Sequence, residues 1–146
     1  MLRTFICSSA LALLLTACPA NSAPPPPPPA PSASGTWEGS ETFPPQFGVS
    51  QSSNPIRYVI VDSGGTLSGQ VFICEGGGFD CPGFTLSGSR NGSAVTLRYD
   101  SFLDTDPPTP VVVSTQATLS GSSLSGTTTY PASDGTFSGT TTLTRK

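Results

Sequence analysis

The sequence predicts an all-β fold, a small antiparallel up-and-down barrel of about eight strands. From residue 35 onward, short stretches of alternating or β-branched residues are separated by Gly, Pro, Asn and Asp, and no extended helical periodicity interrupts them. A tripeptide of Leu or Phe followed by Ser and Gly recurs in these stretches, at residues 67–69, 86–88, 119–121, 124–126 and 137–139. A two-sheet β-sandwich is the main alternative.

The strands are expected in chain order at 36–43, 56–62, 66–73, 83–89, 94–102, 111–119, 123–130 and 136–145. Short segments of turn-forming residues separate several of them: Asp62-Ser63-Gly64-Gly65, Asn91-Gly92, Gly121-Ser122-Ser123 and Ser133-Asp134-Gly135. Such short connections imply antiparallel neighbours. The longer loops are expected at 44–55, 74–82 and 103–110.

Side chains alternate across a strand, so each tripeptide places its Leu or Phe and its Gly on one face and its Ser on the other. Glycine on the apolar face relieves crowding and lets a strand bend, as closing a small sheet requires. The same alternation predicts an inner face made of Trp37, Phe43, Leu67, Val71, Ile73, Phe84, Leu86, Val95, Leu97, Tyr99, Val111, Val113, Leu119, Leu124, Phe137 and Leu143, with Arg145 beside them.

The two ends of this region are Gly35-Thr36-Trp37 and Leu143-Thr144-Arg145. They resemble the lipocalin and avidin-like barrels, in which a Gly-x-Trp opens the first strand and, in lipocalins, an Arg near the last strand packs over that Trp. The resemblance covers these two ends alone. It implies a barrel held shut by Trp37 against Arg145, a cation–π contact that contributes about 0.5–2 kcal/mol.

Residues 1–17 have the layout of a secretion signal, a positive Arg3 followed by an almost uncharged apolar run. The run ends in Leu15-Thr16-Ala17-Cys18, which resembles the bacterial lipobox and implies a lipid, palmitate included, on Cys18. The alternative is an ordinary signal peptide cut near Ala23. The resemblance implies an exported protein anchored to the cell membrane, and Pro19 in place of an Asp favours the outer membrane if the bacterium has one.

Residues 18–34 are expected to form the lipid anchor and a Pro-rich linker, ahead of a β-barrel domain at 35–146. Six consecutive prolines at 24–29 cannot join a helix or a central strand. In polyproline geometry the linker spans up to about 50 Å. We interpret it as a spacer, and binding to an aromatic groove is the alternative.

Two cysteines remain after Cys7 leaves with the leader and Cys18 takes a lipid, namely Cys74 and Cys81. An even pair in an oxidising compartment predicts a disulfide, and closing so small a loop contributes about 2–3 kcal/mol. A metal or redox site is the alternative, which the lack of histidine and of a zinc-like spacing disfavours.

Composition limits the functions that remain. Six basic residues stand against nine acidic ones, and loss of Arg3 takes the net charge from −3 to −4, so no basic face for nucleic acid is expected. With no histidine in the chain, the sequence predicts neither an enzyme nor a cofactor. A carboxylate pair for glycoside hydrolysis, or a weak Ca²⁺ site, is conceivable among Asp100, Asp104 and Asp106, which we interpret instead as turn and loop residues.

The sequence is therefore compatible with two functions. The first is a membrane-anchored cell-envelope lipoprotein with a structural or interaction role toward an envelope protein or glycan. The alternative is lipocalin-like binding of a small ligand inside the barrel, with Glu41, Tyr58, Tyr99 and Thr128 as candidate contacts, because a buried carboxylate needs a partner. A simpler interpretation places Glu41 at the barrel mouth, in water.

Overall fold

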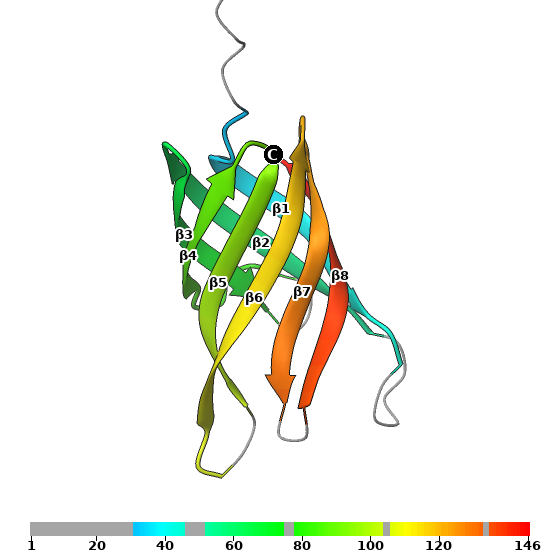
Figure 1. The fold of residues 1–146 in the computed structure, drawn as a ribbon. Coiled ribbons are helices and arrows are strands. Elements are labelled where there is room, and N and C mark those ends of the chain that lie inside the picture. The colour runs from blue at the N-terminus through cyan, green and yellow to red at the C-terminus, as the bar shows by residue number, and fades with distance from the viewer. Residues whose placement is uncertain (1–30, 46–51, 75–77, 104–105, 133–134) are drawn as a thin grey trace, which may run out of the picture.

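The computed structural model confirms the all-β prediction and is a closed, eight-stranded, up-and-down antiparallel barrel (Figure 1). It describes residues 31–45, 52–74, 78–103, 106–132 and 135–146, so the expected signal, Cys18 and most of the linker lie outside the described residues. The strands are β1 (Gly35–Phe43), β2 (Ser52–Ser63), β3 (Thr66–Ile73), β4 (Phe84–Asn91), β5 (Ala94–Leu103), β6 (Thr109–Ser120), β7 (Ser123–Ala132) and β8 (Gly135–Arg145).

The barrel has two distinct ends. At one end, which we call the linker end, β1 begins, β8 finishes, and the tight turns near Gly64, Gly92 and Gly121 join the strands. These three glycines adopt positive φ of 63°, 59° and 58°, as such turns require. At the opposite end, the loop end, β1, β3, β5 and β7 finish. Because the barrel closes between β1 and β8, neither of these strands is left as an open edge.

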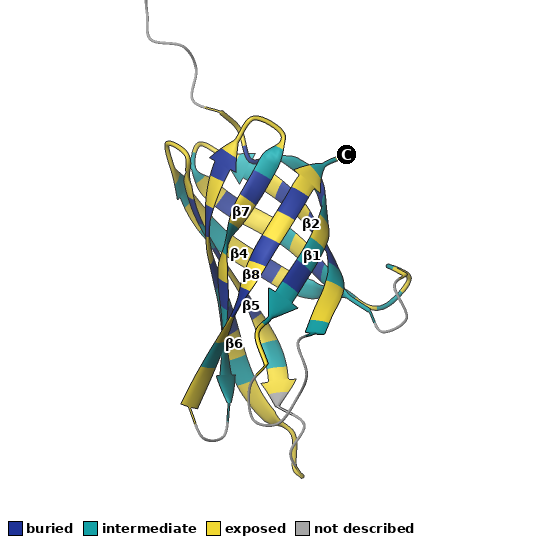
Figure 2. Cartoon of the chain, turned by 90° about the vertical axis from the view of Figure 1, so that its right-hand side faces the viewer, coloured by how far each residue is buried: buried dark blue, intermediate teal, exposed yellow. Residues whose placement is uncertain are grey.

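Alternation along each strand places the apolar side chains inside, and Figure 2 shows the resulting bands of buried and exposed residues. Every residue of the expected inner face that the burial classes cover is buried or half-buried. The largest fully buried side chains are those of Trp37, Tyr58, Ile56, Leu67, Leu86, Leu97, Leu124 and Leu143. The core is therefore a single column of side chains along the barrel axis.

The recurring tripeptide behaves as expected in four of its five copies, with a buried or half-buried apolar residue, an exposed Ser and an inward Gly. At Gly69 the φ is 151° and an added Cβ would collide with the Val59 carbonyl of β2, so the strand bends there in a way that only glycine allows. The copy at 119–121 differs because Gly121 lies in the β6–β7 turn and not on the inner face.

Three strands are longer than the sequence predicts and run through a proline: β7 continues to Ala132 and includes Pro131, and β2 and β6 begin earlier than predicted. β2 starts at Ser52 and includes Pro55, and β6 starts at Thr109 and includes Pro110. Residues 52–55 pair with β1 and have no β3 partner, and Pro110 pairs with β5 alone among the described residues. A proline can join a strand where one side needs no backbone donor, so these positions tolerate it.

The folded unit also takes in residues just before β1 that the sequence assigns to the linker. Ala33 is fully buried, its carbonyl accepts a hydrogen bond from Trp37 Nε1 at 2.9 Å, and its amide donates to Asp62 Oδ2 at 2.9 Å. The Arg145 guanidinium donates to the Ser32 carbonyl at 2.5 Å. Ser32 and Ala33 therefore pack at the linker end, where the Trp37 indole hydrogen-bonds to Ala33.

Candidate functional site

The most unusual residue of the core is a buried carboxylate. Glu41 is 1% exposed on the inner face of β1, opposite Thr141 of β8 in the strand register. The interpretation that Glu41 lies in water at the barrel mouth is therefore wrong. The barrel continues past Glu41: two residues further along β1, the ring of Phe43 packs against those of Tyr130 and Phe137.

Both carboxylate oxygens of Glu41 accept hydrogen bonds from hydroxyl groups. Oε1 accepts from the hydroxyls of Tyr58 at 3.2 Å, Thr128 at 2.9 Å and Thr141 at 3.1 Å. Oε2 accepts from the hydroxyl of Tyr130 at 2.6 Å. Four donors from β2, β7 and β8 therefore meet the carboxylate that β1 supplies.

These donors belong to a larger hydroxyl network. Thr115 on β6 lies 3.2 Å from the Tyr58 hydroxyl and 2.8 Å from that of Thr128, and Thr128 lies 2.5 Å from Thr141. Tyr99 on β5 shares a hydrogen bond of 2.5 Å with Tyr130. The structure thus brings together all four residues that the sequence proposed as ligand contacts, although Tyr99 reaches Glu41 only through Tyr130.

Three members of the network were missed by the sequence analysis, namely Thr115, Thr141 and Tyr130. Strand alternation could have found them, because each lies an even number of residues from an inward neighbour, such as Leu119, Leu143 or Leu124. What alternation cannot show is that these hydroxyls converge on one carboxylate from across the barrel.

Among the described residues, the side-chain hydrogen bonds to Glu41 all come from neutral hydroxyl groups. None of the ion pairs formed by the described residues includes Glu41. Burial, and then the nearby Glu41 carboxylate, raise the pKa of Tyr58, Tyr99 and Tyr130 above the ordinary value. The three phenols are therefore held in the protonated, donating form, and Glu41 already has a protein donor on each oxygen.

An aromatic cluster separates Glu41 from the loop end. The Tyr130 ring stacks on Phe137 with a centroid distance of 5.2 Å and meets the edge of Phe43 at 5.3 Å. On its other side it lies 6.4 Å from Tyr99, which in turn lies 6.1 Å from Phe84. These rings lie on the loop side of the carboxylate, in agreement with the 1% exposure of Glu41.

The predicted disulfide between Cys74 and Cys81 is present, with 5.8 Å between the two Cα atoms. Inside the bridged loop, the ring of Phe79 lies 4.1 Å from the Arg57 guanidinium. Arg57 also pairs with Glu38 of β1 at 2.6 Å. The disulfide therefore holds an aromatic ring against the outer wall of β2.

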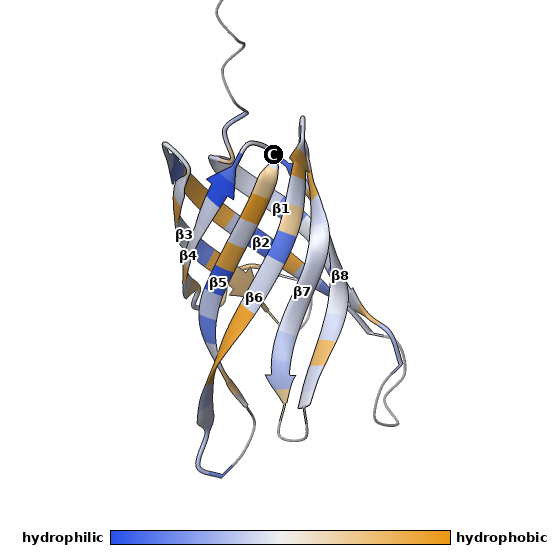
Figure 3. Cartoon of the chain, viewed as in Figure 1, coloured by the Kyte–Doolittle hydropathy of each residue, from blue (hydrophilic) through white to orange (hydrophobic). Residues whose placement is uncertain are grey.

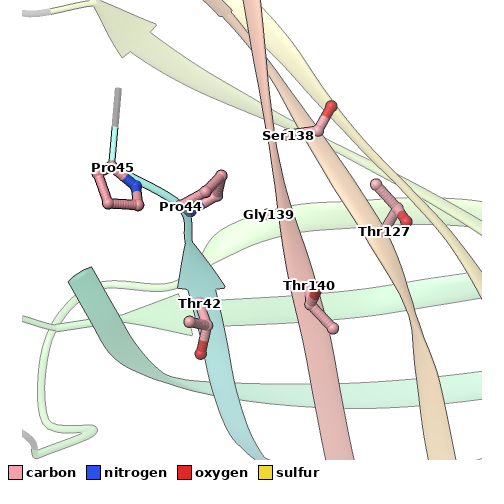
Figure 4. Close-up of a pocket in the computed structure, with 7 residues that line it drawn as sticks. All are labelled: Thr42, Pro44, Pro45, Thr127, Ser138, Gly139 and Thr140. Carbon is pink, nitrogen blue, oxygen red and sulfur yellow. The ribbon is translucent and has the colours of Figure 1, made fainter. Parts of the chain in front are cut away.

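A groove lies on the outside of the barrel at the end of β1 (Figure 4). Its volume is about 370 Å³, and its lining consists of Thr42, Pro44, Pro45, Thr127, Ser138, Gly139 and Thr140. The two prolines follow β1, whereas the other side of the groove belongs to β7 and β8. No charged residue is part of this lining.

Other candidate sites have less support in the structure. The described residues contain no group of three or more His, Cys, Asp or Glu placed to hold a metal ion. Asp100 and Asp106 are exposed, and Asp104 lies outside the described residues. In the ranges that the structure covers, no helix has the length and apolarity needed to cross a bilayer.

Comparison with known proteins gives no relative: the chain matches no family model, no curated protein and no solved structure.

Proposed function

We propose that the chain is an exported bacterial lipoprotein, anchored by a lipid on Cys18, whose barrel acts as an interaction module of the cell envelope. The apolar run of the leader and its end in Leu15-Thr16-Ala17-Cys18 support export and lipidation. The disulfide between Cys74 and Cys81 is consistent with an oxidising compartment.

One observation carries the interaction role: the chain enters the barrel at the linker end, opposite the end where the longer connections lie. Trp37, Asp62 and Arg145 all bind the residues just before β1. An anchor at Cys18 would therefore attach to the linker end and present the loop end and the outer wall of the barrel to the surroundings. The proline-rich spacer adds reach up to about 50 Å.

The core favours an interaction role over a ligand inside the barrel. Four protein hydroxyls already bind the Glu41 carboxylate, and Arg145 Nε is the one buried side-chain polar atom that lacks a hydrogen bond among the described residues. A small polar ligand would have to displace those donors. Partner recognition by the outer surface needs no such rearrangement.

Lipidation is tested by expressing the full chain and its Cys18→Ser variant in a bacterium fed radioactive palmitate. We expect label in the parent chain and none in the variant. Fractionation should place the parent protein with membranes, and with outer membranes in a two-membrane host, while the variant is released with the soluble fraction. An unlabelled parent chain, or equal label in both, would overturn the lipoprotein proposal.

The alternative, a small ligand bound inside the barrel, is favoured by one observation, the buried carboxylate itself. Native mass spectrometry of the protein from its own host tests it, using Glu41→Gln with Glu38→Gln as the matched control. Glu38 lies on the outer face and binds Arg57 and Lys146. A bound mass that only the Glu41 substitution removes would make ligand binding the leading function.

Without a ligand, we expect both variants to show no adduct. Glu41→Gln should then differ from the control in stability alone. The NH2 group of the Gln side chain is a hydrogen-bond donor, and it would face hydroxyls that in the parent protein donate to a carboxylate oxygen. The expected loss in free energy of unfolding is about 1–3 kcal/mol for Glu41→Gln, whereas Glu38→Gln, a change in an ion pair at the protein surface, should alter it little. Chemical denaturation of the two variants measures both.

A further inference from the structure

The outer wall formed by β7 and β8 carries hydroxyl groups almost without interruption. The outward residues of β8 are Thr136, Ser138, Thr140, Thr142 and Thr144, and those of β7 are Ser123, Ser125, Thr127 and Thr129, followed by Pro131. Figure 3 shows these two strands as mostly pale, whereas β2 and β5 alternate between strongly apolar and strongly polar bands. The wall is therefore polar but uncharged.

Strand register aligns these hydroxyls in rows across the wall. Thr127 of β7 pairs with Thr140 of β8, which pairs with Thr42 of β1. In the described part of the chain, the hydroxyls of Thr127 and Thr140 make no side-chain hydrogen bond, and both residues are exposed. Each hydroxyl can both donate and accept, so the row offers free groups of both kinds.

The groove lies on this row, and two proline rings form its other side. Pro44 and Pro45 follow Phe43, whose ring packs so closely on Gly139 that a Cβ there would collide with it. The absence of a side chain at Gly139 thus leaves room for the Phe43 ring against β8, and the two prolines follow directly after this contact. Figure 4 shows the prolines facing the β7 and β8 residues across the groove.

The described outward residues of β7 and β8 carry no formal charge, in contrast to those of β2 and β5. Between residues 123 and 144 of the sequence, the one carboxylic acid is Asp134, outside the described residues, and Arg145 is the first base that follows. The outward residues of the other two strands include Arg57 on β2 and Arg98 and Asp100 on β5. A ligand at the groove therefore meets hydroxyls and pyrrolidine C–H groups and no formal charge.

We propose that this groove is a binding site for a neutral saccharide chain, an assignment that names the partner class of the interaction module and rests on that proposed function. Sugar hydroxyls are donors and acceptors, as are the threonine hydroxyls that line the groove, and the apolar C–H face of a pyranose ring can pack on Pro44 and Pro45. The groove volume of about 370 Å³ lies within the range of small-ligand sites.

The test uses the full lipidated chain in a zwitterionic detergent without sugar groups and measures binding by isothermal titration calorimetry. The probes are the neutral tetramers of N-acetylglucosamine and of β-1,4-glucose, with tetragalacturonate as the anionic comparison. At least one neutral tetramer should bind. Tetragalacturonate should bind at least about tenfold more weakly, because its desolvated carboxylates find no cation in the groove.

Variants locate the site. Thr140→Val keeps the shape of the side chain and removes the hydroxyl, and we expect it to weaken binding about fivefold. The double variant with Thr127→Val should weaken it about tenfold or more. Thr142→Val is the matched control, because Thr142 is also exposed on β8 but does not line the groove, and its affinity should stay within about twofold of the parent.

Valine favours strands, so all three variants should fold, and circular dichroism checks this directly. Binding of neither neutral tetramer would overturn the saccharide proposal, as would binding that both groove substitutions leave unchanged or that the anion matches. Capture of a protein by the same wall in place of a sugar would overturn it too. None of these results affects palmitate labelling at Cys18, so failure of the saccharide site and failure of the lipoprotein proposal are distinguishable.

Discussion

The two ends of the barrel differ in how deeply their side chains are buried and in how their strands pair. At the linker end, Trp37 is fully buried beneath Ala33, the Arg145 guanidinium lies 4.6 Å from its ring, and tight turns join the strands. At the loop end, the rings of Phe43, Tyr130 and Phe137 are half-buried. There β5 and β6 continue as a two-stranded ribbon that leaves Phe102 63% exposed and Val112 52% exposed.

The strand neighbours show the same contrast. Toward the linker end each strand has a partner on both sides, whereas Pro55, Pro110 and Pro131 lie toward the loop end, where their strands have one partner among the described residues. Backbone pairing on both sides leaves no place for a proline. Among the described residues, backbone pairing on both sides of a strand is therefore concentrated toward the linker end.

Truncation of one aromatic side chain at each end tests this contrast most strongly. Trp37→Ala removes the largest fully buried side chain and should lower the free energy of unfolding by about 3–5 kcal/mol. Phe137→Ala at the loop end should cost about half as much, because the ring is half-buried and its loss opens toward solvent. Chemical denaturation followed by circular dichroism compares them. An equal or larger loss from Phe137→Ala would mean that the loop end contributes as much to stability.

Much of this architecture could be predicted from the sequence, because alternation is a local signal. The eight strands, the inward residues and the bends at glycines such as Gly69 all follow from neighbours one or two residues away. The disulfide could be predicted as well, since only Cys74 and Cys81 remain to pair once the leader and anchor are set aside.

Features that depend on contacts between distant strands could not be predicted from the sequence. Pro55 and Pro110 fall in segments that the sequence predicts as loops, although a strand can include a proline where it has a single neighbour. Glu41 is buried because Tyr58, Thr128, Thr141 and Tyr130 supply donors from three other strands, up to 100 residues away in the chain. The groove was not predicted because it depends on where the chain turns after β1.

The loop end has a covalent bond of its own, and removing it should produce the next largest effect. Replacing Cys74 and Cys81 together by Ser opens a loop with a sequence separation of 7. The expected loss in free energy of unfolding is about 2–3 kcal/mol, mainly from the greater freedom of the unfolded chain.

Reducing agent provides the matched control for the disulfide. It should destabilise the parent protein by the same amount and leave the double Ser variant unchanged, as denaturation with and without reductant will show. Because Phe79 contacts Arg57 from within this loop, the effect should remain at the β2 side of the barrel. Amide hydrogen exchange that accelerates first at the linker end would contradict the separation of the two ends.

The smallest predicted effect depends on pH and concerns Asp62 at the linker end. Its carboxylate accepts hydrogen bonds from Arg90 and from the Ala33 amide, two contacts that we call the clamp. The hydrogen bond from Arg90, and then the one from the Ala33 amide, lower the pKa of Asp62 from its ordinary value of 3.8 to about 2. The stabilisation from Asp62 is therefore present above pH 4 and is lost as the pH falls toward 2. Its side chain is 2% exposed, so we expect a loss of about 1–2 kcal/mol over this interval.

Asp62→Asn should abolish this part of the pH dependence, whereas Asp100→Asn, a change at an exposed position of β5, should leave it unchanged. Urea denaturation between pH 2 and pH 6 measures all three proteins. If the clamp couples the linker to the barrel, the parent protein should also lose protection of the Ala33 amide against hydrogen exchange as Asp62 becomes protonated, because that amide donates to the same carboxylate. If the pH dependence remains in Asp62→Asn, another carboxylate causes it. The pH-dependent stability of the linker end would then not depend on the contact between Asp62 and Ala33.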